Sequence, residues 1–277
     1  MRPRVLIIAV LAFVGCRNAT GPESVNKVGI GFQFARTSTA TAIVAAANAN
    51  RDGTSFVGVA PVVTPTANGL RITRDADVIV ISKAQFVIRD VKLKSASTVC
   101  ADDDDAKNSD KRDHSNDADH DCPTLRVGPF LVNLPVNGAD AARVSVPVPA
   151  GTYTSVRLTL HKVTSSGATD ALFAQANPDF RDISIRLDGT YNGLPFVFVS
   201  DVDAQINAPL AQPLVIGPAG HDVTVSIDLS TWFIRSQSGL YAPALANTPG
   251  AVRSAVQNNI KNAFRVFGDR DHDGRED

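Results

Sequence analysis

The sequence has little of several residue types on which common functions depend. Its 277 residues include three Cys, one Met, one Trp and three Tyr, and aromatic residues make up 6%. Few rings are therefore available to stack on a sugar, which disfavours an aromatic sugar-binding platform. The 27 Lys and Arg nearly balance the 28 Asp and Glu. The resulting net charge of −1 provides no general attraction for nucleic acid or for an anionic membrane surface.

Long apolar runs and catalytic motifs are also missing. No segment has 18 uninterrupted apolar residues, and no G-x-S-x-G, H-E-x-x-H or Walker A motif occurs. His161 is predicted to face outward on a strand and His221 to lie in a turn, and neither has a nucleophile partner visible in the sequence. Asp201 and Asp203 form either a carboxylate pair or, far more commonly for such positions, an ordinary turn. We therefore expect a protein that is not an enzyme.

The pattern that is present is that of β-strands. Hydrophobic residues make up 44% of the chain, enough for a substantial core. Apolar and polar residues alternate over 84–94, 143–148 and 152–163, and Asn192-Gly193 predicts a tight hairpin turn. A short helix is expected over 170–176, and Trp232 is expected to fill the core. The sequence predicts an all-β fold, an antiparallel β-sandwich with a C-terminal α-helix.

The C-terminal helix is predicted over 249–267. Thr248 is the candidate N-cap, Pro249 suits the first helical position, and Gly268 suits the position after the last turn. The apolar residues recur at helical spacing and would form one stripe, namely Val252, Val256, Ile260, Ala263, Phe264 and Phe267.

The N-terminus carries an export signal. Arg2 and Arg4 precede an apolar run over 5–14 that is too short to span a bilayer. Gly15 and Cys16 then follow, and a small residue before Cys at this place resembles the lipobox of bacterial lipoproteins. The resemblance implies that Cys16 is acylated, and Arg17 in place of Asp implies the outer membrane.

The chain then divides into four segments. Residues 1–15 are the lipoprotein signal peptide, and 16–55 are the acylated cysteine and a flexible tether, with a candidate first strand at 28–34. The β-sandwich is predicted over 56–247, including an Asp-rich insert at 101–121. The C-terminal helix and an acidic tail occupy 248–277.

The insert lies between Cys100 and Cys122. It contains nine Asp, three basic residues and no large apolar residue, a composition typical of disorder. With Cys16 acylated, two cysteines remain in an oxidising compartment, which favours a Cys100–Cys122 disulfide. The alternative is a metal site that uses these cysteines with His114 and His120. The Asp cluster itself either chelates Ca²⁺ or is a solvated acidic loop.

The tail from residue 269 onward matches D-x-D-x-D-G, the first half of a calcium loop. Asp269, Asp271 and Asp273 would supply carboxylates, and Arg275 its backbone carbonyl. Because the sequence has no Glu at the twelfth position, we expect a weak calcium site or, equally, a solvated acidic tail. No other cofactor is expected.

Several stretches are similar to uncharacterised bacterial lipoproteins that carry an extracytoplasmic β-sandwich domain of unknown function, carbohydrate-binding-like or transthyretin-like in pattern. The matching residues are 146–153, 177–180, 188–193 and 260–274, within a similarity that covers about 70–277. The resemblance implies the fold and the location and carries over no catalytic residue.

The expected function is that of a lipid-anchored envelope or surface protein with a non-catalytic binding or structural role. The expected partners are the membrane, through the N-terminal lipid, and a glycan or an envelope protein, with no nucleic acid. The rival hypotheses are an extracytoplasmic hydrolase that uses carboxylates and a periplasmic metal-binding protein that uses the Asp/His insert.

Overall fold

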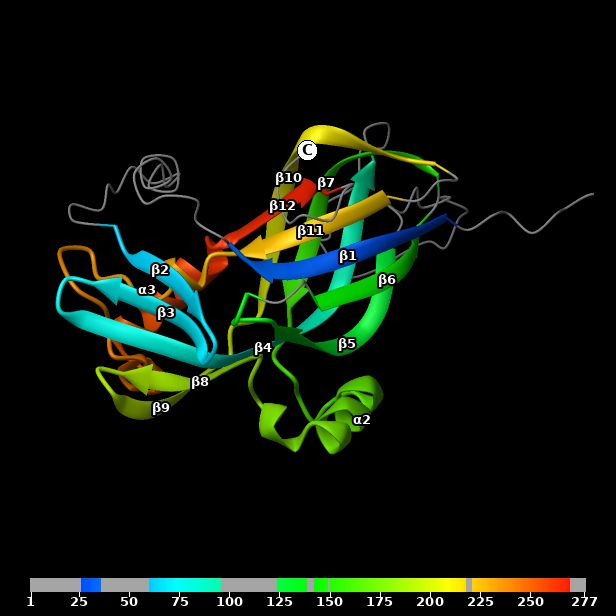
Figure 1. Ribbon diagram of the computed structural model, residues 1–277. Helices are drawn as coiled ribbons and strands as arrows, with labels where there is room; N and C mark the ends of the chain where they lie inside the picture. The colour runs from blue at the N-terminus through cyan, green and yellow to red at the C-terminus, as the bar shows by residue number, and fades with distance from the viewer. Residues whose placement is uncertain are drawn as a thin grey trace, which may run out of the picture.

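The computed structural model describes residues 26–35, 60–95, 124–138, 142–148, 150–217 and 221–269. Within these ranges the all-β prediction is confirmed, because the strands form a four-stranded and an eight-stranded sheet (Figure 1). The four-stranded sheet has the order β12 (Phe264–Gly268), β11 (His221–Ile227), β1 (Asn26–Phe34), β6 (Ala142–Val148). Its β1–β11 pair is parallel, and every other pair of the two sheets is antiparallel.

The eight-stranded sheet is built around one long strand, β4 (Asp77–Ser95). The beginning of β4 pairs with β3 and β8, and its end pairs with β5 and β7. Three outer strands complete the sheet, β2 beside β3, β9 beside β8, and β10 beside β7. The remaining bounds are β2 (Val62–Thr66), β3 (Gly69–Arg74), β5 (Thr124–Leu134), β7 (Gly151–Leu160), β8 (Ile185–Tyr191), β9 (Leu194–Ser200) and β10 (Ala204–Ile216).

The end of β4 belongs to what we call the two-sheet half, in which β5, β7 and β10 lie against the four-stranded sheet. Aromatic side chains join the two layers. The ring of Phe86 on β4 lies 6.4 Å from that of Phe32 on β1 and 6.5 Å from that of Phe264 on β12, both edge-on. All three rings belong to one apolar core that continues through the rest of the molecule.

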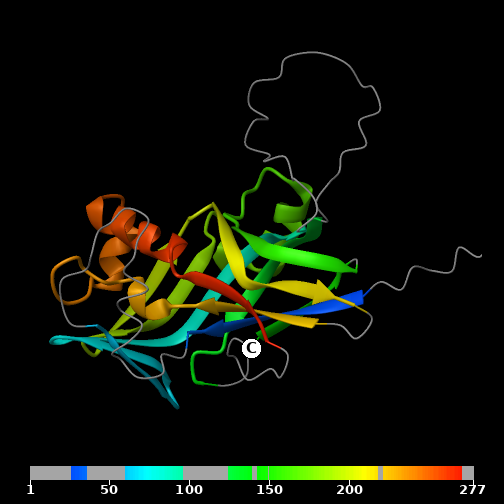
Figure 2. The same ribbon diagram turned by 90° about the horizontal axis from the view of Figure 1, so that it is seen from above.

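The beginning of β4 belongs to the helix-capped half, with β2, β3, β8 and β9. One face of these strands is covered by the chain between residues 229 and 261, which contains η3 (Leu229–Thr231), η4 (Pro243–Asn247) and α3 (Ala251–Lys261) (Figure 2). Trp232 is fully buried here, as expected, and Phe233 packs edge-on against Phe198 of β9 at 5.2 Å.

A separate small apolar cluster lies under α2 (Ala168–Ala176) and η2 (Pro178–Phe180). Val87 of β4 points into this cluster, whereas its neighbours Phe86 and Ile88 point into the main core. The helix predicted over 170–176 is thereby confirmed, and it covers a face of the large sheet that would otherwise meet solvent.

The tight turn predicted at Asn192-Gly193 is confirmed. Asn192 and Gly193 have φ values of 50° and 83°, and the hairpin β8–β9 that they connect is the predicted one. The β4–β5 register shifts between Ile88 and Asp90, opposite Gly128-Pro129 of β5.

Three predicted boundaries are wrong. β1 confirms the candidate strand at 28–34, but the segment 16–55 that was predicted as a tether thereby contributes an inner strand to the four-stranded sheet. The strand expected over 84–94 begins earlier, at Asp77, as part of the longer strand β4. The predicted helix 249–267 begins after Gly250, ends at Lys261 and is followed by β12. The edge of β11 is available to residues 264–268, and sheet pairing there outweighs their helical spacing.

Candidate functional site

Most of the residues predicted to carry a site lie outside the described residues. These are Cys16, Cys100, Cys122, Asp271, Asp273 and Arg275. β4 comes before Cys100 in the chain and β5 comes after Cys122. These two strands are neighbours in the sheet, because Lys92 of β4 pairs with Thr124 of β5. The Cys100–Cys122 disulfide stays a prediction that this pairing favours.

Asp269 is the one predicted calcium ligand that the structure describes. It directly follows β12, is 3% exposed, and its Oδ2 accepts a 2.8 Å hydrogen bond from the Thr224 hydroxyl. The start of the D-x-D-x-D-G segment is thus attached to the four-stranded sheet. In the described part of the chain, no group of three or more His, Cys, Asp or Glu side chains is placed to hold a metal.

His161 was predicted to be on the surface, and this is wrong. It directly follows β7 and is 4% exposed, and its Nε2 lies 2.9 Å from each carboxylate oxygen of Asp170 on α2. Its Nδ1 lies 3.3 Å from Nη1 of Arg89. Arginine can only donate, so Nδ1 accepts and Nε2 carries the proton given to Asp170. His161 lies on the opposite face from Leu160, as the alternation predicts, but α2 covers that face and buries the imidazole.

Asp170 also fixes the loop before α2. Its Oδ2 accepts hydrogen bonds from the Thr164 backbone N–H at 2.8 Å and from the Thr164 hydroxyl at 3.0 Å. Burial would raise the pKa of Asp170, but the hydrogen bonds from Thr164 and His161 lower it below its usual value. Asp170 thus joins α2 to the loop at Thr164 and to His161 at the end of β7.

Asp201 and Asp203 have different partners and do not act as a pair. Asp201 accepts hydrogen bonds from Arg253 and from Gln257, the latter at 3.0 Å, so it attaches α3 to the end of β9. Burial would raise its pKa, but Arg253 lowers it. Asp203 is exposed, and its Oδ2 lies 3.8 Å from Nδ1 of His161.

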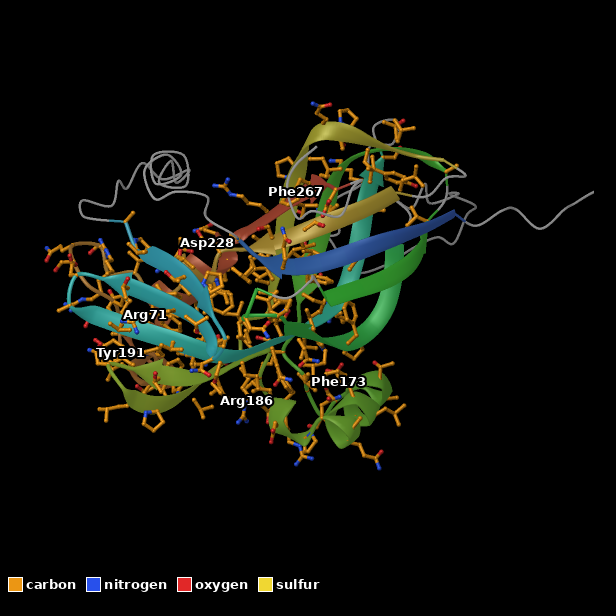
Figure 3. The ribbon with its side chains drawn as sticks, in the orientation of Figure 1. Arg71, Phe173, Arg186, Tyr191, Asp228 and Phe267 are labelled. Atoms are coloured by element: carbon orange, nitrogen blue, oxygen red, sulfur yellow. The ribbon has the colours of Figure 1, made fainter. Side chains whose placement is uncertain are left out.

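A second group of carboxylates lies at the turn between β3 and β4. Asp77 accepts hydrogen bonds from the Tyr191 hydroxyl at 2.8 Å and from the Leu240 N–H at 2.7 Å, and Asp75 accepts one from the Gly239 N–H at 2.7 Å. Burial would raise the pKa of Asp77, but these hydrogen bonds lower it. The loop before Leu240 is thereby fastened to the helix-capped half. Figure 3 shows Tyr191 and Arg71 in this half, and Phe173 on α2 to the right of it.

A hollow of about 270 Å³ opens where the neighbours of β4 change. On this side of β4, pairing with β3 ends at Ile81 and pairing with β5 begins at Ala84. Ser82 and Lys83 therefore lie in the gap between two diverging strands. The β2–β3 turn forms one wall and the end of β5 with the following turn forms the other; the lining residues are 67–69, 82–84 and 133–137.

The hollow's first wall is held in place by its backbone. Gly69 has φ +128°, and a Cβ at this position would overlap the carbonyl oxygen of Ile81. The Thr66 hydroxyl donates a 2.8 Å hydrogen bond to the Gly69 carbonyl. Only glycine allows this close approach of the turn to β4.

Polar side chains dominate the open part of the hollow. Lys83, Asn68 and Asn133 are exposed there, and none of the described lining residues is acidic. Within the described part of the chain, no acidic side chain lies within ion-pair distance of Lys83. Sequence reasoning missed this group, because three separate segments form it and none of them carries a motif.

The chain was compared with known protein families, curated proteins and solved structures. No protein-family model, no curated protein and no solved structure matches it. Among the described residues, no helix has the length and apolar character needed to cross a membrane.

Proposed function

We propose that the chain is an extracytoplasmic protein, anchored to the bacterial outer membrane through lipid on Cys16, with a non-catalytic binding role. The hollow between β3 and β5 is the observation that carries the binding role. It is a concave polar surface that the fold holds open where β3 and β5 diverge, and small-molecule sites in proteins are commonly concave and largely formed before the ligand binds.

The position of β1 suits the anchor. Asn26, the first residue of β1, comes ten residues after Cys16. Ten residues span at most about 35 Å, so the folded part would stay close to the membrane. Asn26 pairs with Val148, and β7 begins three residues later, so we take this end of the two-sheet half as the membrane side.

The hollow is directed away from that side. Ser95 pairs with Tyr153 near the start of β7, so the end of β4, and with it the start of β5, lies on the membrane side. β5 then runs 11 residues to Leu134, at the hollow. A strand of this length covers roughly 30 Å, which would leave the hollow open to ligands in solution.

The rival hydrolase hypothesis has its best support in His161 and Asp170. A general base needs a nitrogen with a free lone pair that faces the substrate. Both nitrogens of His161 are engaged, one by Asp170 and the other by Arg89, and the imidazole is almost fully buried. Among the described carboxylates, Asp77, Asp170 and Asp201 hold loops and helices together, a structural use that favours the non-catalytic role.

The anchor is tested by replacing Cys16 with Ser in the full chain. We expect Cys16→Ser to abolish labelling by a fatty-acid analogue and to move the protein into the soluble fraction. Cys100→Ser is the matched control and should remain labelled and membrane-bound. Unchanged membrane association of Cys16→Ser would refute the proposed anchor.

Weak calcium binding by the tail is part of the proposal, with Asp269, Asp271, Asp273 and the Arg275 carbonyl as ligands. We expect dissociation constants of about 10⁻⁴–10⁻³ M, as for incomplete extracellular sites. Calcium calorimetry should show this binding in the intact protein and lose it in an Asp271→Asn, Asp273→Asn double variant. If the two titrate identically, the calcium response belongs to the Asp/His insert at 101–121 or to neither segment.

A further inference from the structure

Building on the proposed binding role, we propose that the hollow between β3 and β5 binds an acidic monosaccharide, a single sugar ring that carries a carboxylate. The inference rests on the size, charge and hydrogen-bonding character of the lining.

The size of the hollow fits one ring. Its volume of about 270 Å³ lies just below the roughly 300–1,000 Å³ of pockets for drug-sized ligands. The wall at Gly69 is fixed by the Thr66 hydrogen bond and by the contact with β4. The site is therefore largely formed before a ligand arrives, which reduces the entropy cost of binding.

The charge of the hollow selects an anion. Among the described lining residues, Lys83 is the only one with an ionisable side chain, and it is exposed on β4 between two strands that have separated. A neutral ligand would leave this ammonium group without a counter-charge. A carboxylate would provide one through a charge-assisted hydrogen bond, which is stronger than a neutral one.

The hydrogen bonds already present divide the lining into donors and acceptors. Gln85 donates to the Oδ1 of Asn133, so the amide NH₂ of Asn133 is the part left to donate. Ser82 donates its hydroxyl proton to the Asp188 carbonyl at 3.0 Å, so its oxygen is left to accept. Asn68 makes no hydrogen bond to any described residue and offers both functions. Lys83 and Asn133 thus supply donors for a carboxylate, while Ser82 and Asn68 suit sugar hydroxyls.

Small apolar groups complete the surface. Ala67, which is exposed, and Pro135, which is half-buried, line the hollow beside the polar groups. The C–H face of a sugar ring can lie against such side chains without an aromatic platform, which accounts for a sugar site in a chain poor in Trp and Tyr. A simple carboxylate such as acetate would satisfy Lys83 and leave this surface uncovered.

The test is calorimetric titration of the full chain with glucuronate, glucose and acetate, together with NMR mapping of the backbone amides. We expect glucuronate to bind in the millimolar range and at least about tenfold more tightly than glucose or acetate. Its amide shifts should be confined to residues 67–69, 82–84 and 133–137. Lys83→Gln should weaken glucuronate binding about tenfold, the size expected for one charge-assisted hydrogen bond.

Lys94→Gln is the matched control, because it removes the same charge from an exposed position of the same strand, outside the hollow. Equal losses in the two variants would overturn the site, since the effect would then be one of net charge. Equal affinity for glucose and glucuronate, or no saturable glucuronate binding, would overturn the ligand class. If glucuronate binds but shifts amides elsewhere, the inference about the hollow fails while the proposed binding role stands.

Discussion

The two halves of the molecule cover the same strand, β4, in different ways. In the two-sheet half, the cover is a sheet whose strands come from residues 26–34, 142–148, 221–227 and 264–268. In the helix-capped half, the cover is one continuous stretch from residue 229 to residue 261. The first arrangement closes many long loops during folding, whereas the second closes few.

The two halves also differ in what attaches the cover. Edge-on aromatic rings join the layers of the two-sheet half. In the helix-capped half, the apolar contacts of Trp232 and Phe233 are accompanied by hydrogen bonds from loop backbone to Asp75 and Asp77. A defect in the first half should therefore destabilise the whole fold, and a polar defect in the second should open one loop.

The largest effect is expected at the centre of β4. Phe86→Ala removes the ring that contacts both Phe32 and Phe264, so it should lower the free energy of unfolding by about 3–5 kcal/mol. Urea denaturation provides the measurement, and hydrogen exchange should accelerate in both halves. Leu194→Ala, at a side chain that is 72% exposed, is the control and should change little. Accelerated exchange in one half alone would contradict the shared core.

A smaller and local effect is expected at the β3–β4 turn. Asp77→Ala removes the acceptor for Tyr191 and Leu240 and should lower the free energy of unfolding by about 1–3 kcal/mol. The Leu240 amide should exchange faster, while amides of β1 and β11 should keep their protection. Asp179→Ala, at an exposed carboxylate with one long ion pair, is the matched control. Loss of protection in β1 would show that the loop and the two-sheet half unfold together.

The third prediction concerns pH and the contacts that Asp170 of α2 makes with His161 and Thr164. Because the pKa of Asp170 is lowered in the folded state, ionised Asp170 stabilises the fold above its unfolded pKa. This contribution of about 1–2 kcal/mol is lost as the pH falls through the folded pKa. Asp170→Asn should therefore lower stability at pH 7 and reduce the difference in urea midpoint between pH 7 and acid. If the urea midpoint of Asp170→Asn depends on pH as that of the unmodified protein does, ionised Asp170 adds no stabilisation.

The smallest effect is expected at Asp228, between β11 and η3. Burial raises its pKa even though Ser230 donates two hydrogen bonds to its Oδ1. Its ionisation therefore costs stability as the pH rises from its unfolded pKa through the raised folded value, the opposite sign to Asp170. Asp228→Asn keeps the acceptor for the Ser230 N–H, so stability at pH 7 should change by less than about 0.5 kcal/mol. The positive charge of Arg265 on β12 acts in the opposite direction to burial and lowers the pKa of Asp228. A large loss of stability at pH 7 would show that the attraction between these two charges is needed.

The features predicted correctly are those decided within a few residues. The Asn192-Gly193 turn requires two positive φ values in succession, which this pair tolerates, and the flanking alternation identifies β8 and β9. The helix α2 and the buried Trp232 were predicted for similarly local reasons. His161 was misjudged because its alternation was correct while its exposure depended on α2, a separate element.

The sequence by itself determined the β class, the local turns and the short helix, because strand alternation and turn dihedrals are properties of neighbouring residues. Tertiary structure alone decided that β1 lies between β11 and β6, that residues 264–268 pair as a strand, and that β4 has different neighbours at its two ends. It also decided the hollow, which brings Asn68, Lys83 and Asn133 together. Such arrangements depend on which sheet edges and faces remain open once the rest of the chain has packed. A local sequence pattern does not contain this information, because the segments that compete for an edge or a face are far apart in the chain.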